Sequence, residues 1–366
     1  MTIYIVDIEP LETRYTGEWQ KYLPTQMRNA TGKEVVQISG KTLPDAPSPN
    51  AFLNFATTNA YKAEQIAQIA TMFDEQAIKD GDYFLFTDAW NTDVLKLQYM
   101  AKNLGVNIKC GGMWHAGSYD ENDFLGRNIG DAKWVRHAEK AMFYAYDDNF
   151  FATVFHKEMF CGVHALVDCD SISIVGWPME YLKQLIKPAG PKENIVLFPH
   201  RPAEEKQPEL FRDLSKEFPD WQFIICQEKK LTKPQYHAML QKAKFVFSAN
   251  LQETLGISWY EGLLAGALPL LPDRLSYREM AVADFKYPRV FTDSKTEYDQ
   301  NKEHFVKWIR SMLERYDELA AKHLSSLGSI DAEVLWGKLG ANNEDQLTKL
   351  DAFFTGNALY KCISKS

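Results

Sequence analysis

The feature that most constrains the fold is an alternation of short apolar runs with longer segments of helical spacing. In the first half of the chain, runs of strand length stand at 3–8, 34–39, 83–88, 107–114 and 150–155. Helical spacing lies between them, as at 60–75 and 132–146. This alternation predicts βαβ units that form a mostly parallel sheet. Residues that act on a ligand are then expected just after the strands, at the carboxyl edge of the sheet.

A second series of the same kind begins later in the chain. Its apolar runs stand at 193–200, 221–227, 245–250 and 267–273. Helical segments are expected between them, at 208–218 and 234–242. The segment 176–193 separates the two series and carries three prolines and two glycines, which is typical of a linker. We therefore predict an N-terminal Rossmann-like domain over 1–180 and a second over 181–290. Charged helices over 291–366 are expected to pack across the domains.

Length and composition agree with a folded protein of about two domains. The chain has 366 residues, of which 45% are apolar and 25% charged. Its 41 basic and 49 acidic residues give a net charge of −8, which repels polyanions. Any contact with nucleic acid would therefore need a local basic surface.

The N-terminus and the cysteines favour a cytoplasmic protein. The sequence MTIYIVDIEP lacks the basic and apolar regions of an export signal. The longest apolar run, 263–271, is shorter than the ~20 residues that span a bilayer, so we expect no membrane partner. The five cysteines form no CxxC pair, which argues against a disulfide framework and a zinc site.

The densest functional signal begins with HRPAEEK at 200–206, directly after an apolar run. The guanidinium of Arg201 and the ammonium of Lys206 could hold two phosphates and offset the charge of a departing diphosphate. The alternative is that both are solvated charges at a helix start. No GxxxxGK loop, HExxH pair or convincing GxGxxG is present, which removes most nucleotide hydrolases, zinc hydrolases and dehydrogenases.

The signal continues in QETLGISWYEGLLAG, at 252–266. Glu253 and Glu261 are separated by seven residues, about two helical turns, which sets both carboxylates along one side if the helix begins near Leu255. Backbone N–H groups at the start of this helix are expected to face an anion. The residues that open it are Thr254, Leu255, Gly256 and Ile257.

Together these motifs resemble the nucleotide-sugar-binding domain of retaining GT-B glycosyltransferases that carry a Glu-x7-Glu motif. The resemblance implies an α/β chain of two Rossmann-like, doubly wound domains facing a central cleft. It implies that Glu253 contacts the donor sugar, Glu261 holds the nucleotide ribose, and Arg201 and Lys206 bind the diphosphate. The donor would be a nucleotide diphosphate sugar, with UDP favoured and GDP as the alternative, and no metal would be required.

The resemblance looks closest to enzymes that glycosylate nucleobases, namely tRNA-queuosine mannosyltransferases and phage glycosyltransferases of hydroxymethylated DNA. It extends into GWP at 176–178, FPHR at 198–201 and LLPDRLSYRE at 270–279. It implies 5-hydroxymethylcytosine in DNA as the acceptor, ahead of queuosine in tRNA. The rival interpretations are a lipid or polysaccharide acceptor, and a catalytically silent protein that only binds the nucleotide sugar.

Two residues of the first half follow expected strands and are candidates for catalysis. By resemblance, His115 reaches the donor sugar and orients the anomeric carbon, although a core histidine is the alternative. Asp88 matches an acidic position of the same enzymes, where a carboxylate accepts a proton from the acceptor hydroxyl or orients it. A helix cap is the alternative role for Asp88.

Two further segments bear on the acceptor and on a metal. The loop 9–19 offers Glu12, Thr13 and Arg14 in place of the Gly-Gly-Ser-His of the queuosine enzymes. The Asp-x-Asp at 168–170 resembles a metal motif of another glycosyltransferase class, but its place near the linker indicates a turn.

Aromatic residues cluster in sequence around His115. Most of them are expected in the core, and one that is exposed would be able to stack on an acceptor base. The cluster consists of Trp90, Trp114, Tyr119, Phe124 and Trp134.

Overall fold

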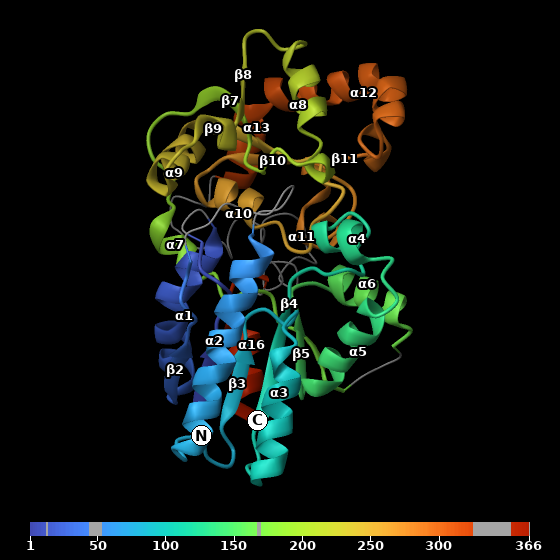
Figure 1. Cartoon of the computed structure of the whole chain (residues 1–366). Helices are drawn as coiled ribbons and strands as arrows, with labels where there is room; N and C mark the ends of the chain where they lie inside the picture. The colour runs from blue at the N-terminus through green and yellow to red at the C-terminus, as the bar shows by residue number, and fades with distance from the viewer. Residues whose placement is uncertain (12–13, 44–52, 167–169, 325–352, 366) are drawn as a thin grey trace. The chain divides into compact units, whose positions relative to one another are not determined.

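The computed structural model describes residues 1–11, 14–43, 53–166, 170–324 and 353–365. The chain divides into two compact units (Figure 1). Unit 1 comprises Met1–Pro178 and Thr355–Ser366, and unit 2 comprises Met179–Phe354. Glu12 and Thr13 of the first loop and the first two residues of the Asp-x-Asp segment lie outside the described residues.

Unit 1 is built on a six-stranded sheet in which all neighbouring strands are parallel. The strand order is β2-β1-β3-β4-β5-β6, so the winding direction reverses between β1 and β3. In doubly wound sheets the carboxyl ends at such a reversal form the ligand-binding edge. The strands are β1 (Thr2–Val6), β2 (Glu34–Ile38), β3 (Tyr83–Phe86), β4 (Lys109–Trp114), β5 (Asp148–Phe151) and β6 (Ile172–Ile174).

Helices connect the strands of unit 1. The middle strands are buried along their length, as in β3, so their sequences read as continuous apolar runs. The C-terminal helix α16 packs against α1, and α3 packs between α2 and α5. The helices are α1 (Tyr15–Thr31), α2 (Phe55–Asp74), α3 (Asp93–Leu104), α4 (Phe124–Ile129), α5 (Val135–Ala145), α6 (Val154–His164) and α16 (Asn357–Lys365).

Unit 2 has a five-stranded parallel sheet with the order β11-β10-β9-β7-β8. Its winding reverses between the adjacent strands β7 and β9. The residues that follow these two strands therefore lie at the ligand-binding edge of this unit. The strands are β7 (Glu193–Phe198), β8 (Gln222–Ile225), β9 (Ala243–Phe247), β10 (Leu268–Pro272) and β11 (Lys286–Tyr287).

The helices of unit 2 carry most of the residues discussed below. A short 3-10 segment, η1 (Glu204–Lys206), follows β7, and another, η2 (Cys226–Lys229), follows β8. The α-helices are α7 (Leu182–Leu185), α8 (Pro208–Ser215), α9 (Lys233–Lys242), α10 (Ile257–Leu264), α11 (Tyr277–Met280), α12 (Lys295–Glu314) and α13 (Tyr316–Leu324). The last 3-10 segments are η3 (Ala283–Phe285) and η4 (Arg289–Phe291).

The observed elements follow the predicted alternation, with one difference. The short strands β6 and β11 were not predicted as strands, because they contribute only three and two residues to their sheets. Of the described residues in the stretch 291–366, those up to Phe354 belong to unit 2 and those from Thr355 belong to unit 1. In the described part of the chain, no helix has the length and apolar character of a membrane span.

Candidate active site

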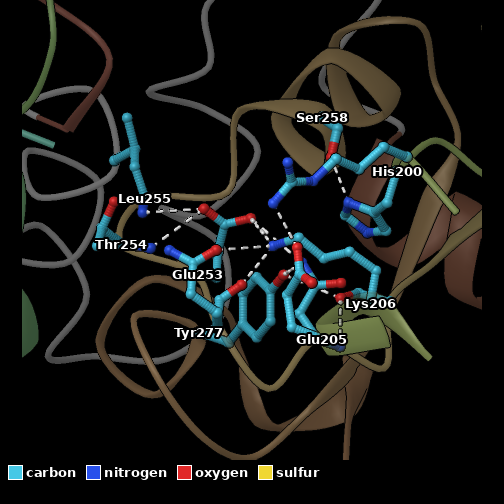
Figure 2. Close-up of polar contacts among 12 residues, drawn as sticks. His200, Glu205, Lys206, Glu253, Thr254, Leu255, Ser258 and Tyr277 are labelled. Carbon is cyan, nitrogen blue, oxygen red and sulfur yellow. Dashed lines mark hydrogen bonds and ion pairs between the residues drawn. The ribbon is translucent and has the colours of Figure 1, made fainter. Parts of the chain in front are cut away.

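The loops after β7 and β9 bring Lys206 against the residue pair Gln252 and Glu253 (Figure 2). The Lys206 ammonium donates to the Gln252 backbone carbonyl and, over 3.1 Å, to its side-chain Oε1. It lies 3.9 Å from Oε2 of Glu253. Lys206 is only 7% exposed, and a buried ammonium is stable only where acceptors surround it. The cluster therefore places a buried ammonium at the reversal of the sheet.

The carboxylate of Glu253 bridges two parts of its own loop. Oε1 accepts from the backbone N–H groups of Thr254 at 3.1 Å and Leu255 at 3.4 Å (Figure 2). Oε2 accepts from Nδ2 of Asn250 at 3.2 Å. The sequence predicted that these amides face a ligand anion, but here the anion they meet is the carboxylate of Glu253.

Arg201 follows β7 and forms an ion pair with Glu205 of η1. Its guanidinium forms an ion pair with Oε1 of Glu205, whose side chain is 1% exposed. Arg201 lies in the loop before η1, so the helical i, i+4 rule does not predict this pair from the sequence. The pair fixes the guanidinium beside the Lys206 segment η1.

A buried polar network supports the loop under Glu253. The Asn250 side chain donates to the hydroxyl of Tyr277 at 3.0 Å, and this hydroxyl also lies 2.9 Å from Oγ of Ser248. The Asn250 carbonyl accepts from Nε of Arg274 at 2.7 Å. All four side chains are at most 5% exposed, so the loop has a rigid base. Sequence motifs do not reveal Asn250 and Tyr277, because the two residues lie 27 positions apart and meet only in the folded chain.

Helix α10 begins at Ile257, behind Gly256. Gly256 has φ 90°, and a Cβ there would lie 2.5 Å from Nε1 of Trp259, so only glycine fits. Beside this turn, Oγ of Ser258 lies 3.4 Å from Nδ1 of His200 (Figure 2). Burial lowers the pKa of His200 well below its ordinary value, so the ring is neutral near pH 7.

Glu261 belongs to a different hydrogen-bonded group from Glu253. Its Oε2 accepts from the hydroxyl of Tyr236 at 2.8 Å, and its Oε1 lies 3.5 Å from the Lys233 ammonium. Both partners stand on α9, and the Glu261 side chain is 6% exposed. Because α10 starts after Leu255, Glu253 lies in the preceding loop, not on the helix, and the simple two-turn spacing does not apply.

In unit 1, His115 follows β4 and has both ring nitrogens engaged. Nε2 lies 2.6 Å from the carbonyl oxygen of Thr87, which can only accept, so Nε2 carries the proton. Nδ1 then accepts from the hydroxyl of Tyr15 at 2.9 Å. Burial lowers the pKa of His115, which favours this neutral form. The rings of Trp19 and Trp177 lie 5.5 and 5.0 Å from the imidazole.

Asp88 follows β3 at the same edge of unit 1. Its Oδ2 lies 2.9 Å from the Lys62 ammonium of α2, and its Oδ1 accepts from the backbone N–H of Trp90 at 3.2 Å. Lys62 also donates to the Trp90 carbonyl at 2.8 Å. The next helix, α3, starts at Asp93 after Thr92, so Asp88 is not its N-cap. Its side chain remains 19% exposed.

The comparisons with known proteins concern the fold. No family model matches the chain, and no curated protein matches it. Among solved structures, a sucrose-phosphate synthase from Thermosynechococcus elongatus has a TM-score of 0.64 at 13% identity, covering 100% of this chain and 96% of that one. The lipopolysaccharide outer core galactosyltransferase WaaB has a TM-score of 0.52 at 12% identity, with 100% and 98% covered.

A third similar structure is that of TarM, with a TM-score of 0.52 at 14% identity. The match covers 82% of this chain but only 58% of TarM. At such identities the likeness defines the fold. The chain has two parallel-sheet α/β units that match the GT-B fold of glycosyltransferases.

Proposed function

We propose that the chain is a glycosyltransferase that moves a sugar from a nucleotide diphosphate donor to an acceptor hydroxyl, with retention. One observation carries this proposal. Lys206, Glu253 and the amides of Thr254 and Leu255 meet at the carboxyl edge of β7 and β9, where a doubly wound sheet binds its ligand. The GT-B fold supports the same conclusion.

In this proposal Lys206 and Arg201 bind the donor diphosphate. Phosphate oxygens replace the Gln252 oxygens as acceptors for the Lys206 ammonium. The two cations then offset the negative charge that develops on the leaving group. We assign no role to a metal ion, so transfer is expected to continue in the presence of a chelator.

Glu253 is proposed to orient the donor sugar. The backbone amides of Thr254 and Leu255 now donate to the Glu253 carboxylate. A sugar hydroxyl both donates and accepts, so it is able to donate to this carboxylate and accept from these amides in its place. Glu261 is proposed to hold the nucleotide ribose, as the resemblance implies. In the transfer step the bond from the anomeric carbon to the phosphate oxygen breaks. The acceptor oxygen bonds to the same face, and its proton passes to the departing phosphate.

The acceptor is proposed to be a hydroxymethylated base in DNA, with UDP-sugar as the favoured donor. This rests on the resemblance carried by 176–178, 198–201 and 270–279. In unit 1, the Asp88 side chain is partly exposed, so its carboxylate is able to accept a hydrogen bond from an acceptor hydroxyl. The two bonds of His115 favour an orienting role for that residue over direct proton transfer.

The proposal is tested by incubating the protein with UDP- and GDP-sugars and either hydroxymethylated DNA or tRNA. Mass spectrometry of the digested nucleosides should show a hexose or pentose added to 5-hydroxymethylcytosine. Transfer to a saccharide or lipid alone would overturn the acceptor. Donor binding without hydrolysis or transfer would identify a silent binding protein instead.

A further inference from the structure

We propose that the outward face of α5 in unit 1 is a nucleic-acid docking surface. This face consists of His137, Lys140 and Tyr144 on α5, together with Lys133 and Trp134 directly before the helix. The inference rests on the proposed nucleic-acid acceptor and adds where the strand lies on the protein. The aromatic residue Trp134 is exposed, unlike most of its aromatic neighbours in sequence.

Trp134 stands apart from the other aromatic residues around His115. Trp114, Tyr119 and Phe124 are at most 4% exposed, whereas Trp134 is 54% exposed. Tyr144, at the other end of α5, is 69% exposed. Exposed rings on one helix face provide stacking surfaces for bases, as in proteins that bind single strands.

The spacing along α5 places Lys140 on the same side as Tyr144. His137, Lys140 and Tyr144 recur at intervals of three and four residues, and Lys133 and Trp134 stand directly before the helix. The opposite side of the helix carries Val135, Glu139, Met142 and Phe143, which are buried in unit 1. The amphipathic pattern therefore leaves an outward face that is basic and aromatic.

The cations of this face lack acidic partners among the described residues. Elsewhere on the surface lysines are paired, for example Lys295 with Asp299 and Lys302 with Asp213. No such ion pair involves Lys133 or Lys140 in the part of the chain that the structure describes. The only carboxylate of α5, Glu139, is buried and lies 3.0 Å from Arg136 and 3.1 Å from His164. In a chain of net charge −8, this face is complementary to a polyanion.

The face begins at the edge of the sheet that carries the candidate catalytic residues. Because α5 leads directly into the parallel strand β5, its N-terminal end lies on the side of Asp88 and His115. Glu139 ties the helix to the Asp88 loop, since its Oε1 accepts from Nε1 of Trp90 at 3.0 Å. From Trp134 to Tyr144 the helix spans roughly 15 Å, the length of about four nucleotides of a stacked strand.

The chemistry of the face favours a nucleic acid over a lipid surface. Helices that bind membranes insert large aliphatic or aromatic side chains from a continuous apolar stripe. The large aliphatic residues of α5 point inward, and its exposed rings are separated by Lys140 and His137. Rings alternating with cations suit stacked bases and their phosphates.

The test uses the whole protein and a fluorescein-labelled single-stranded DNA oligonucleotide containing 5-hydroxymethylcytosine. Binding is followed by anisotropy between about 50 and 200 mM salt. The double variant Lys133→Gln/Lys140→Gln should lower the slope of log Kd against log salt by about 1.4. Trp134→Ala should weaken binding about tenfold, and Trp134→Phe should restore most of it. The matched control is Lys361→Gln/Lys365→Gln on α16, which removes the same charge from exposed positions of the same unit.

Three results would overturn the inference. One is an equal slope for the α5 and α16 double variants. Another is the absence of DNA binding by the unaltered protein. The third is that the protein binds anionic phosphatidylserine vesicles but not DNA, and that the α5 variants weaken the binding to vesicles. UDP binding and donor hydrolysis in the same samples test the proposed function separately, because neither is expected to depend on Lys133 or Lys140.

Discussion

The ammonium of Lys206 lies 3.9 Å from Oε2 of Glu253, across the carboxyl ends of the adjacent strands β7 and β9. The position of this pair follows from the winding of unit 2, because it lies where the strand order reverses. The same carboxylate accepts from two backbone N–H groups of its own loop. The site therefore places one cation, one carboxylate and two amides within reach of a single ligand.

Removing the Lys206 charge should abolish most transfer. Lys206→Met is expected to lower kcat/KM by at least about 100-fold, as for other groups that stabilise a developing negative charge. Glu253 keeps its bonds to Asn250 and to the amides, so the melting temperature should change little. Lys229→Met, an exposed lysine of the same unit, serves as the control. Near-normal turnover of Lys206→Met would remove this residue from the site.

Glu253→Ala provides a second test of the same site. It removes the carboxylate that we assign to the donor sugar, while the loop keeps the bonds of Asn250 to Tyr277 and Arg274. We expect transfer to be lost and UDP binding to remain, because the diphosphate is assigned to Lys206 and Arg201. Isothermal calorimetry with UDP and a transfer assay separate the two effects. Loss of UDP binding with an intact fold would contradict this division of roles.

Replacing Gly256 with alanine should destabilise the fold more than the same change at Gly190, another glycine of unit 2 with positive φ. Gly190 has φ 67° and open space around its Cα, so Gly190→Ala should cost about 1 kcal/mol of unfolding free energy. Gly256 has φ 90°, and a Cβ there would lie 2.5 Å from Trp259 Nε1 and 3.1 Å from Tyr277 Cε1. Gly256→Ala should cost about 3 kcal/mol, because overpacking adds to the backbone strain. Equal losses in denaturant titrations would contradict the account of this turn.

The buried His156 predicts a loss of stability in acid. Burial lowers its pKa from 6.5 to about 3, and its Nε2 lies 2.7 Å from the hydroxyl of Tyr119. A histidine with a lowered pKa in the folded state stabilises the fold above pH ~6.5, and this contribution is lost as the pH falls towards 3. The lowered pKa corresponds to about 5 kcal/mol. His156→Gln should flatten the dependence of unfolding free energy on pH in this window. His304→Gln, at an exposed position, is the control, and equal slopes would refute the prediction.

Asp88 and Lys62 should affect the acceptor half of the reaction only. Asp88→Asn is expected to lower kcat for transfer about 100-fold, because its carboxylate orients the acceptor hydroxyl for attack. Lys62→Met removes the 2.9 Å contact that positions Asp88 and should give a smaller loss, with Lys62→Arg restoring part of it. Hydrolysis of the donor without acceptor should be unchanged in all three variants. A parallel loss of hydrolysis and transfer would contradict the assignment.

The sequence predicted the elements well where apolar spacing alone determines them. Strand β3, for example, is a buried apolar run. By contrast, the partners of Glu261 stand on α9, and those of His115 are Tyr15 and Thr87. Such contacts depend on how elements distant in sequence pack, which spacing does not reveal. Likewise, the bonds from the amides of Thr254 and Leu255 to Glu253 depend on a side-chain rotamer.

The most direct test of the central claim is mass spectrometry of nucleosides from hydroxymethylated DNA after incubation with the protein and UDP-sugars. The unaltered protein should add the mass of one sugar to 5-hydroxymethylcytosine, and Lys206→Met should add almost none. No added mass on any acceptor, together with no donor hydrolysis by the folded protein, would contradict the claim that this chain transfers sugar.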